Sequence, residues 1–504
     1  MAQLLTERYA DQILGELSCF DRVVISGMIP QIGYAQAMTA ELFRRKIRVF
    51  DYAQFAEPFR DEIRHNAERL AQKNGLTIEF IQRLNFRKET RIKKILRERG
   101  EHPGLVHIYS AMESCSSFRP WHDKKTGKTF LKYRKAKCLH YYFYFIDEKL
   151  GLCYMRVPTW APFRLQFYFN GHNHLAAKLR EAGIVFTLAE NVFLQVDDFD
   201  QAQAIANQVN VGALHRWLSR WARLFCPVIR HFSSGYHWSV MQVEWATDIL
   251  FRSPADLKPL YEELVRTAIH AVKPRDVATF LGRRLSDRFE GEIGNSFHTR
   301  VEGTRIKHQL NRVSIKMYDK LGIVLRIETT ANDVTFFKHR RRVEHRDGSW
   351  SMDIAPVRKT IYSLPALRDL MGAANRRYLK FISDLDDPTA GFKALLKIAE
   401  RVRDPRDRSY RGFNLFGDDD LTLFEAIVAG EFTISGFRNR QLRDLIPTKS
   451  PGQMSRLLKR LRLHGLIKKA AKSYKYYLTK LGRKVVILAL KLRRFFVIPE
   501  LAQA

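Results

Sequence analysis

The chain has 504 residues, of which 86 are Lys or Arg and 53 are Asp or Glu, so its formal net charge is +33. A chain of this length is expected to form three or four domains with a sizeable core. The five cysteines are scattered and odd in number, which argues against a disulfide framework. The first residues do not resemble a signal peptide, and no apolar run reaches transmembrane length. We therefore expect a cytoplasmic protein without membrane contact.

The positive charge is spread over the whole chain. Residues 451–504 hold 14 Lys and Arg against one acid, a balance of +13. The other 450 residues hold 72 Lys and Arg against 52 acids, a balance of +20. Cations clustered on ordered elements favour a nucleic-acid partner, and charge on the rest of the chain suits a protein that follows a long phosphate backbone.

The first 285 residues are expected to form three regions. Residues 1–110 have mainly helical patterns, interrupted by one apolar strand at 22–26. Residues 111–200 are predicted to be rich in sheet, because two aromatic runs flank a turn at 147–151 and so indicate a hairpin. Residues 201–285, which are rich in Trp, are predicted to be helical again.

Residues 286–400 are predicted to form an antiparallel sheet together with helices. Strand alternation from Val313 to Lys320 places apolar side chains on one face and polar side chains on the other. Arg305 with Lys307, and Arg326 with Glu328, alternate in the same way. If these strands pair, one face is apolar core and the other carries Arg, Lys and Tyr.

The polar face of this sheet is a candidate nucleic-acid platform. Cations beside a tyrosine suit backbone phosphates and a stacked base. The candidate contacts on this face are Arg305, Lys307, Lys316 and Lys320. The alternative is a solvated sheet face on which Glu328 pairs with Lys316 or Arg326.

The same strands resemble a family of DNA-processing proteins. Lys316-Met317-Tyr318-Asp319-Lys320, followed by Arg326-Ile327-Glu328, resembles a stretch of the rolling-circle replication initiators of phages and plasmids, and Gly171-His172-Asn173 is similar to a short run in some of them. That family nicks one DNA strand with a tyrosine and holds a metal ion with acids or histidines. The resemblance implies Tyr318 as nucleophile, Glu328 as metal ligand, and Mg²⁺ or Mn²⁺ as the cofactor of such an activity.

The chain also departs from that family. It has no histidine–bulky apolar–histidine motif, and His172-Asn173-His174 has a polar centre. No metal site is therefore assigned, and whether the protein is an enzyme stays open. If Tyr318 is a nucleophile, Lys316 and Lys320 beside it are expected to lower the pKa of its hydroxyl.

The C-terminal residues have a regular pattern of helices and strands. Residues 401–417 are predicted to be a charged linker that leads into a module at 418–504. Ser450 as N-cap, Pro451 in the first turn and Gln453 in a capping box mark its third helix. The elements are expected at 421–428, 439–445, 451–464, 466–469, 473–478 and 480–492.

The third helix has an apolar stripe and an opposite face rich in cations. The residues of this module expected to contact nucleic acid are Gln453, Ser455, Arg456, Lys459, Arg460, Lys472 and Lys475. Arg456 and Lys459 are expected to read bases in the major groove. Lys472, at the tip between the two strands, is expected to bind the phosphate backbone.

This module resembles the winged helix-turn-helix of MarR-like transcriptional regulators. The resemblance lies in Gly465-Leu466-Ile467-Lys468-Lys469 and in Tyr476-Tyr477-Leu478-Thr479-Lys480-Leu481-Gly482-Arg483. It implies a recognition helix in the major groove and a wing on the adjacent backbone. The alternatives for the module are protein contacts or RNA binding.

Three classes of function follow from the sequence. In the first, the protein recognises DNA through the winged helix and holds a strand on the basic sheet, as a replication initiator or mobile-element protein. In the second, it is a non-enzymatic ribonucleoprotein component that binds a guide or structured RNA. In the third, it is a MarR-like transcriptional regulator, against which the charge outside the module argues. Phosphate attraction alone does not separate DNA from RNA, and no pattern indicates the oligomeric state.

Overall fold

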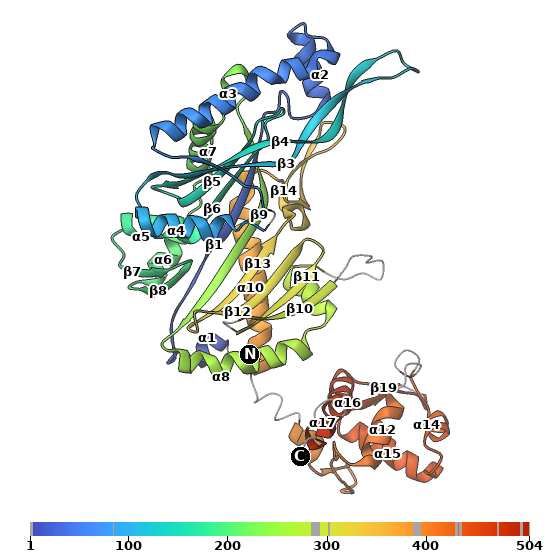
Figure 1. Cartoon of the computed structure of the whole chain (residues 1–504). Helices are drawn as coiled ribbons and strands as arrows, with labels where there is room; N and C mark the ends of the chain where they lie inside the picture. Colours follow the sequence, from blue (N-terminus) through green and yellow to red (C-terminus); the bar gives the residue numbers. More distant parts are fainter. Residues whose placement is uncertain are drawn as a thin grey trace. The chain divides into compact units, whose positions relative to one another are not determined.

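The computed structural model (Figure 1) is a mixed α+β protein, as the sequence predicts. The chain divides into two compact units, Met1–Asp386 (unit 1) and Asp387–Ala504 (unit 2). The structure describes residues 4–83, 85–283, 293–300, 303–386, 395–428, 432, 436–470, 473–493 and 497–502. Among these residues, no helix is both long enough and apolar enough to cross a lipid bilayer.

In the described part of unit 1, eleven strands form one sheet in which β2 and β3 are parallel and the other neighbours antiparallel. Their order is β10 (Ile293–Arg300), β11 (Gly303–Leu310), β12 (Val313–Lys320), β13 (Val324–Ala331), β9 (His237–Phe251), β1 (Ile13–Met28), β6 (Leu165–Asn170), β5 (Gly151–Pro158), β4 (Thr129–Asp147), β3 (Gly104–His122) and β2 (Ile78–Phe80). The four regions expected before residue 400 therefore share one sheet instead of forming separate domains.

The region 201–285 is not all helical, contrary to the expectation from its sequence. Its middle forms β9, a 15-residue strand between β13 and β1. Trp238 and Trp245, which suggested helices, lie in the core of the sheet and are each 2 % exposed. From Trp245 to Phe251 every residue of β9 is buried, so this half of the strand lacks the polar alternation that marks a strand with one solvated face.

Helices cover both faces of the sheet. The main core lies under α2 (Ala35–Arg44), α3 (Tyr52–Lys73), α7 (Val211–Phe225), α8 (Pro254–Ala271), α9 (Pro274–Phe280) and α10 (Leu364–Asp386). Smaller apolar clusters on the other face involve α4 (Lys88–Arg99), α5 (Gly171–Glu181), α6 (Phe199–Ala206) and the hairpin of β7 (Phe186–Ala189) and β8 (Val192–Val196). The short α1 (Leu5–Arg8) packs against α10.

A buried polar residue of α10 fixes the centre of the sheet. Asn375 donates from Nδ2 to the carbonyl oxygens of Trp245 in β9, at 3.1 Å, and Ile327 in β13, at 3.0 Å. Its Oδ1 accepts a hydrogen bond from Thr329 Oγ1 at 2.7 Å. Because a buried amide without partners is unfavourable, these bonds favour one position of α10 against both strands.

Two hairpins of unit 1 extend the sheet or lie beside it. β3 and β4 have 19 residues each and run past α2 to a tip (Figure 1). The expected hairpin at 147–151 is confirmed, because β4 and β5 are antiparallel with Asp147 opposite Gly151. β14 (Lys338–Glu344) and β15 (Trp350–Pro356) form a separate two-stranded sheet.

All five cysteines are free and buried.

Unit 2 has its elements where the sequence predicts them. They are α12 (Asp418–Ile427), α14 (Asn439–Leu445), α15 (Pro451–Leu463), β18 (Ile467–Lys469), β19 (Tyr476–Leu478), α16 (Lys480–Leu492) and a short α17 (Ile498–Leu501). Ser450 and Gln453 form the expected capping box of α15. Met454, Leu458 and Leu461 of its apolar stripe lie in the core of unit 2.

Residues 401–417 belong to unit 2 and are not the linker expected from their charge. Within them, β16 (Val402–Arg403) pairs with β17 (Ser409–Tyr410). Phe413 is 4 % exposed and lies in the core of unit 2. The alternating charges of this segment suggested a linker although Phe413 is buried. Asp404 accepts hydrogen bonds from backbone N atoms of the turn that joins the two strands.

Candidate functional site

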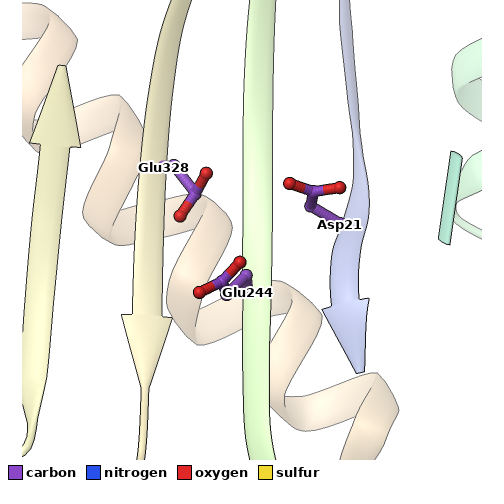
Figure 2. A group of neighbouring side chains, drawn as sticks. All are labelled: Asp21, Glu244 and Glu328. Carbon is purple, nitrogen blue, oxygen red and sulfur yellow. The ribbon is translucent and has the colours of Figure 1, made fainter. Parts of the chain in front are cut away.

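Three carboxylates from neighbouring strands meet on one face of the sheet in unit 1. Asp21 lies on β1, Glu244 on β9 and Glu328 on β13, and Figure 2 shows their side chains directed toward one another. One carboxylate oxygen of each lies within 4.8 Å of the others. Asp21 and Glu328 are buried and Glu244 is half-buried. These three residues are called the carboxylate cluster.

Strand register and a β-bulge bring the cluster together. Glu328 lies opposite Ala246 of β9, so it is a diagonal neighbour of Glu244 on the same face. On β1, Asp21 and Arg22 together lie opposite the single residue Glu244, because the register shifts there. Such a bulge re-aims a side chain, and here it directs Asp21 toward the other two acids.

Asp21 is held as a charged carboxylate by four neighbours. Asn170 Nδ2 and Asn191 Nδ2 each donate to Asp21 Oδ1 at 2.8 Å. His172 Nδ1 lies 3.2 Å from the same oxygen, and Arg326 Nη1 lies 3.5 Å from Oδ2. Burial by itself would raise the pKa of Asp21, but these hydrogen bonds and charges outweigh burial and lower the pKa well below its usual value.

Arg326 faces the cluster from inside the protein. It is fully buried, and its Nε and Nη2 each donate to a carboxylate oxygen of Asp248 at 2.6 Å. Its Nη2 also donates to the carbonyl oxygen of Asn191 at 2.5 Å. Arg326 therefore pairs with Asp248. It does not pair with Glu328, which was one of the two pairings expected for a solvated sheet face.

Lys316 and Tyr318 of β12 both bind Glu328. Lys316 Nζ lies 2.5 Å from Glu328 Oε1 and 3.6 Å from Glu244 Oε1, so one ammonium group bridges two carboxylates. The Tyr318 hydroxyl donates to Glu328 Oε2 at 2.6 Å. The expected pairing of Glu328 with Lys316 is thus present, but on side chains only 2 % and 16 % exposed, not on a solvated face.

Tyr318 does not have the lowered pKa expected of a nucleophile. Burial raises the pKa of its hydroxyl well above the usual value, and the negative charge of Glu328 adds to this effect. Lys316 is bound by Glu328, while Lys320 donates to Asn191 Oδ1 and lies 3.7 Å from Glu190. The expectation fails mainly because the Tyr318 hydroxyl is buried, and also because acids on other elements pair with both lysines.

The pKa of Glu244 is raised in the carboxylate cluster. Burial and the charge of Glu328 raise its pKa to about 6, while Lys316 acts in the opposite direction. Gln242 Nε2 and Thr330 Oγ1 donate to Glu244 Oε1 at 3.1 and 3.3 Å. Near neutral pH the cluster therefore holds more negative charge than Lys316 alone offsets.

The donor set of the cluster suits a hard divalent cation. Mg²⁺ and Mn²⁺ prefer carboxylate oxygens, and the three residues that would hold one are Asp21, Glu244 and Glu328. Hydrogen bonds from neighbouring side chains orient metal ligands in proteins. Asn170 orients Asp21 in this way, and Tyr318 orients Glu328.

Two cations of β11 lie beside the cluster. Lys307 is the register partner of Lys316, and burial together with repulsion from Lys316 and Arg305 lowers its pKa. In the described part of the chain, neither Arg305 nor Lys307 forms a salt bridge. Cations without counter-charges attract phosphate. Arg305 and Lys307 are therefore available to a phosphate beside the candidate metal site, whereas Lys316 is bound by Glu244 and Glu328.

A comparison with protein-family models, with curated proteins and with solved structures found no match. Function therefore has to follow from the chemistry of the residues. The resemblance to replication initiators named Glu328 as a metal-ligand candidate, whereas the sequence analysis did not single out Asp21 or Glu244. The available signal was a lone acid inside an apolar strand, as in Phe20-Asp21-Arg22-Val23, whereas Glu244 lies in a segment expected to be helical.

Helix α15 of unit 2 presents three of the expected contacts at its surface. Gln453, Ser455 and Arg456 are exposed. Lys475 of the following hairpin is half-buried. Lys472 lies outside the described residues.

Two other expected contacts of α15 serve the fold of unit 2. Lys459 forms a salt bridge with Asp404. Arg460 is 4 % exposed and donates to both carboxylate oxygens of Asp420, at 2.7 and 2.9 Å, and to the carbonyl oxygen of Arg411 at 3.0 Å. The helical pattern of α15 could not reveal that the preceding segment folds over this face.

We predict that Glu244→Gln stabilises unit 1 at high pH. The folded protein favours the protonated form of Glu244, so ionisation above a pKa of about 6 lowers stability, whereas the amide stays neutral. The gain should reach about 2 kcal/mol at pH 7.5 and vanish near pH 4. Urea unfolding in metal-free buffer measures it, followed by fluorescence, because all seven Trp lie in unit 1. The exposed Glu344→Gln should show no such pH-dependent difference.

We predict that Arg460→Ala destabilises unit 2 by about 3 kcal/mol or more, because it leaves the buried Asp420 without its partner. Amide hydrogen exchange of the full chain measures the change, as a loss of protection confined to unit 2. The exposed Arg456→Ala on the same helix is the control and should keep protection. Equal protection in both variants would show that the Asp420 pair contributes little.

Proposed function

We propose that this protein binds DNA and that unit 2 recognises a duplex as a winged helix. The observation that carries the proposal is the geometry of α15. Its apolar stripe packs into the core of unit 2, while Gln453, Ser455 and Arg456 are exposed together near its start. Side chains at the start of such a helix contact base edges in the major groove of DNA.

The strands that follow α15 support this proposal. β18 and β19 pair as an antiparallel hairpin, and Phe437 forms a further bridge with Tyr476 of β19. Lys468 and Lys469 of β18 are exposed. A basic hairpin after a recognition helix suits the phosphate backbone beside the groove, which positions the helix without reading sequence.

We predict that Arg456→Ala flattens the preference of the protein among DNA sequences. Each good base contact is worth roughly 1–3 kcal/mol of discrimination, so the preferred site should lose about five- to 150-fold of its advantage. Selection of bound duplexes from a random pool, followed by competition binding, measures this change. Arg462→Ala removes the same charge at the other end of α15 and should keep the ranking of sites. An unchanged ranking in Arg456→Ala would reject α15 as the recognition helix.

A second function is favoured by the carboxylate cluster, namely metal-dependent cleavage of a nucleic-acid strand. The specific observation is the juxtaposition of three acids with Arg305, Lys307 and Lys316 on one sheet face. A divalent cation held by the acids would stabilise negative charge on a phosphodiester. Arg305 and Lys307 would bind the neighbouring phosphates, which places the strand across β11 and β12.

Within this second function, the contacts favour water over Tyr318 as the nucleophile. The Tyr318 hydroxyl donates to Glu328 and its pKa is raised, so its proton is held at neutral pH. Tyr318 is then a positioning residue that orients Glu328, as Asn170 and Asn191 orient Asp21. In hydrolysis the oxygen of water bonds to phosphorus, one phosphorus–oxygen ester bond breaks, and the leaving oxygen takes up a proton from the water, without a covalent protein intermediate.

We predict that Glu328→Gln weakens Mn²⁺ binding more than about tenfold, because it removes a ligand from the cluster. Titration calorimetry measures this directly, with Glu344→Gln as the control that should bind like the parent. Equal Mn²⁺ affinity in the parent and in Glu328→Gln would reject the metal site.

The variant Tyr318→Phe distinguishes water from the Tyr318 hydroxyl as the nucleophile. Cleavage of single-stranded or supercoiled DNA with Mg²⁺ or Mn²⁺ should persist in this variant, and the parent should form no covalent protein–DNA adduct. An adduct in the parent that disappears in Tyr318→Phe would instead establish the tyrosine mechanism that the resemblance to replication initiators implies.

A further inference from the structure

The β3–β4 hairpin carries a run of cations with only one acid among them, away from the carboxylate cluster. Residues 118–137, here called the arm, contain one acid, Asp123, and eight cations. The cations are Arg119, Lys124, Lys125, Lys128, Lys132, Arg134, Lys135 and Lys137. Seven of them are exposed, and Lys132 is half-buried.

The cations of the arm are not paired with acids of the described residues. None of them forms a salt bridge with a described residue. Asp123 instead organises the turn, where it accepts hydrogen bonds from the Lys125 backbone N at 3.0 Å and from Thr126 Oγ1 at 2.8 Å. This contrasts with Lys316 and Arg326 of the same sheet, which are neutralised by buried acids.

Like charges face each other across the arm. Arg119 on β3 lies directly opposite Lys132 on β4. Both pack on Trp121, whose ring centroid lies 5.5 Å from the Arg119 guanidinium carbon and 3.7 Å from Lys132 Nζ. Opposed like charges destabilise a hairpin, and a bound polyanion would remove this repulsion.

The base of the arm is anchored, which lets the hairpin keep its shape. Phe118 and Leu131 are 5 % and 2 % exposed and belong to the main core. The Leu131 backbone N donates to Thr39 Oγ1 of α2 at 3.0 Å. Beyond this anchor the two strands run to a tip that extends past α2 (Figure 1).

The dimensions of the arm fit a nucleic-acid duplex. Lys137 lies nine positions after Lys128 at the tip, and a strand rises about 3.3 Å per residue, so the cations cover about 30 Å. This is close to one turn of duplex DNA, and the major groove admits a two-stranded β-ribbon. The aromatic Trp121 and Tyr133, 38 % and 57 % exposed, lie among the cations and can contact the sugars.

We propose that the β3–β4 arm binds the sugar–phosphate backbone of a DNA duplex, as a contact separate from the α15 helix of unit 2. The inference rests on the proposed DNA-binding function and assigns a second contact surface to it. The arm contributes affinity without sequence preference, because its cations meet phosphates, which carry no sequence information.

The test is a triple variant at the tip, K124Q/K125Q/K128Q, in the full chain. The matched control is K73Q/R97Q/K258Q, which removes the same charge from exposed positions on α3, α4 and α8. Binding of a labelled 40-base-pair duplex is measured by fluorescence anisotropy over a range of NaCl concentrations. Each phosphate contact contributes about 0.9 to the slope of log affinity against log salt.

The tip variant should lower this slope by about 2 to 3 and weaken binding at 0.1 M salt by about tenfold or more, with the ranking of DNA sites unchanged. The control variant should change the slope by less than about 1. Equal slopes for the tip and control variants would overturn the arm as a DNA contact. So would a tip variant that loses affinity for single strands or anionic phosphatidylserine vesicles while its duplex binding is unchanged.

The same measurements separate failure of the arm from failure of the proposed function. If the parent binds duplexes with a preference that depends on Arg456, and the tip variant behaves like the control, only the arm assignment is wrong. If the parent does not bind duplex DNA, the proposed function fails and the arm assignment fails with it.

Discussion

Three acids packed at the centre of a sheet repel one another, and much of unit 1 is arranged around that repulsion. The Lys316 ammonium bridges Glu244 and Glu328, and Arg326, His172 and two asparagines surround Asp21. Burial and the charge of Glu328 still raise the pKa of Glu244 beside these partners. A fold selected only for stability would replace such a cluster by apolar side chains, because buried charges cost several kcal/mol to desolvate. A divalent cation bound by the cluster, as in the second proposed function, would complete its charge.

The cluster depends on long-range pairing that no local segment contains. β1, β9 and β13 come from distant parts of the chain, and Asn375 of α10 ties β9 to β13 from the opposite face. The bulge at Asp21 places that acid on the same side as the other two. A one-residue change of register in any of the three strands would move a carboxylate to the apolar core, so the geometry of the site and the stability of the sheet are coupled.

The formal net charge is +33, and the cationic side chains discussed above fall into two groups with different roles. Arg326, Lys316 and Arg460 are buried or nearly so and each is bound by a carboxylate, so they stabilise the fold. Seven of the eight arm cations and Arg456 are exposed and can reach a phosphate partner. Charge alone therefore supports a nucleic-acid partner, whereas only burial and pairing tell which cations can reach it.

Local signals in the sequence determined the elements of unit 2 and the strands around Tyr318. The capping box at Ser450, the glycine after α15 and the alternation from Val313 to Lys320 depend on neighbours in the chain, so they could be interpreted without a structure. The tertiary structure alone decided that β9 is a strand, that Arg460 is buried and that Asp21 and Glu244 join Glu328. The physical reason is that burial and strand pairing depend on segments far away in sequence, whose contacts outweigh local preference.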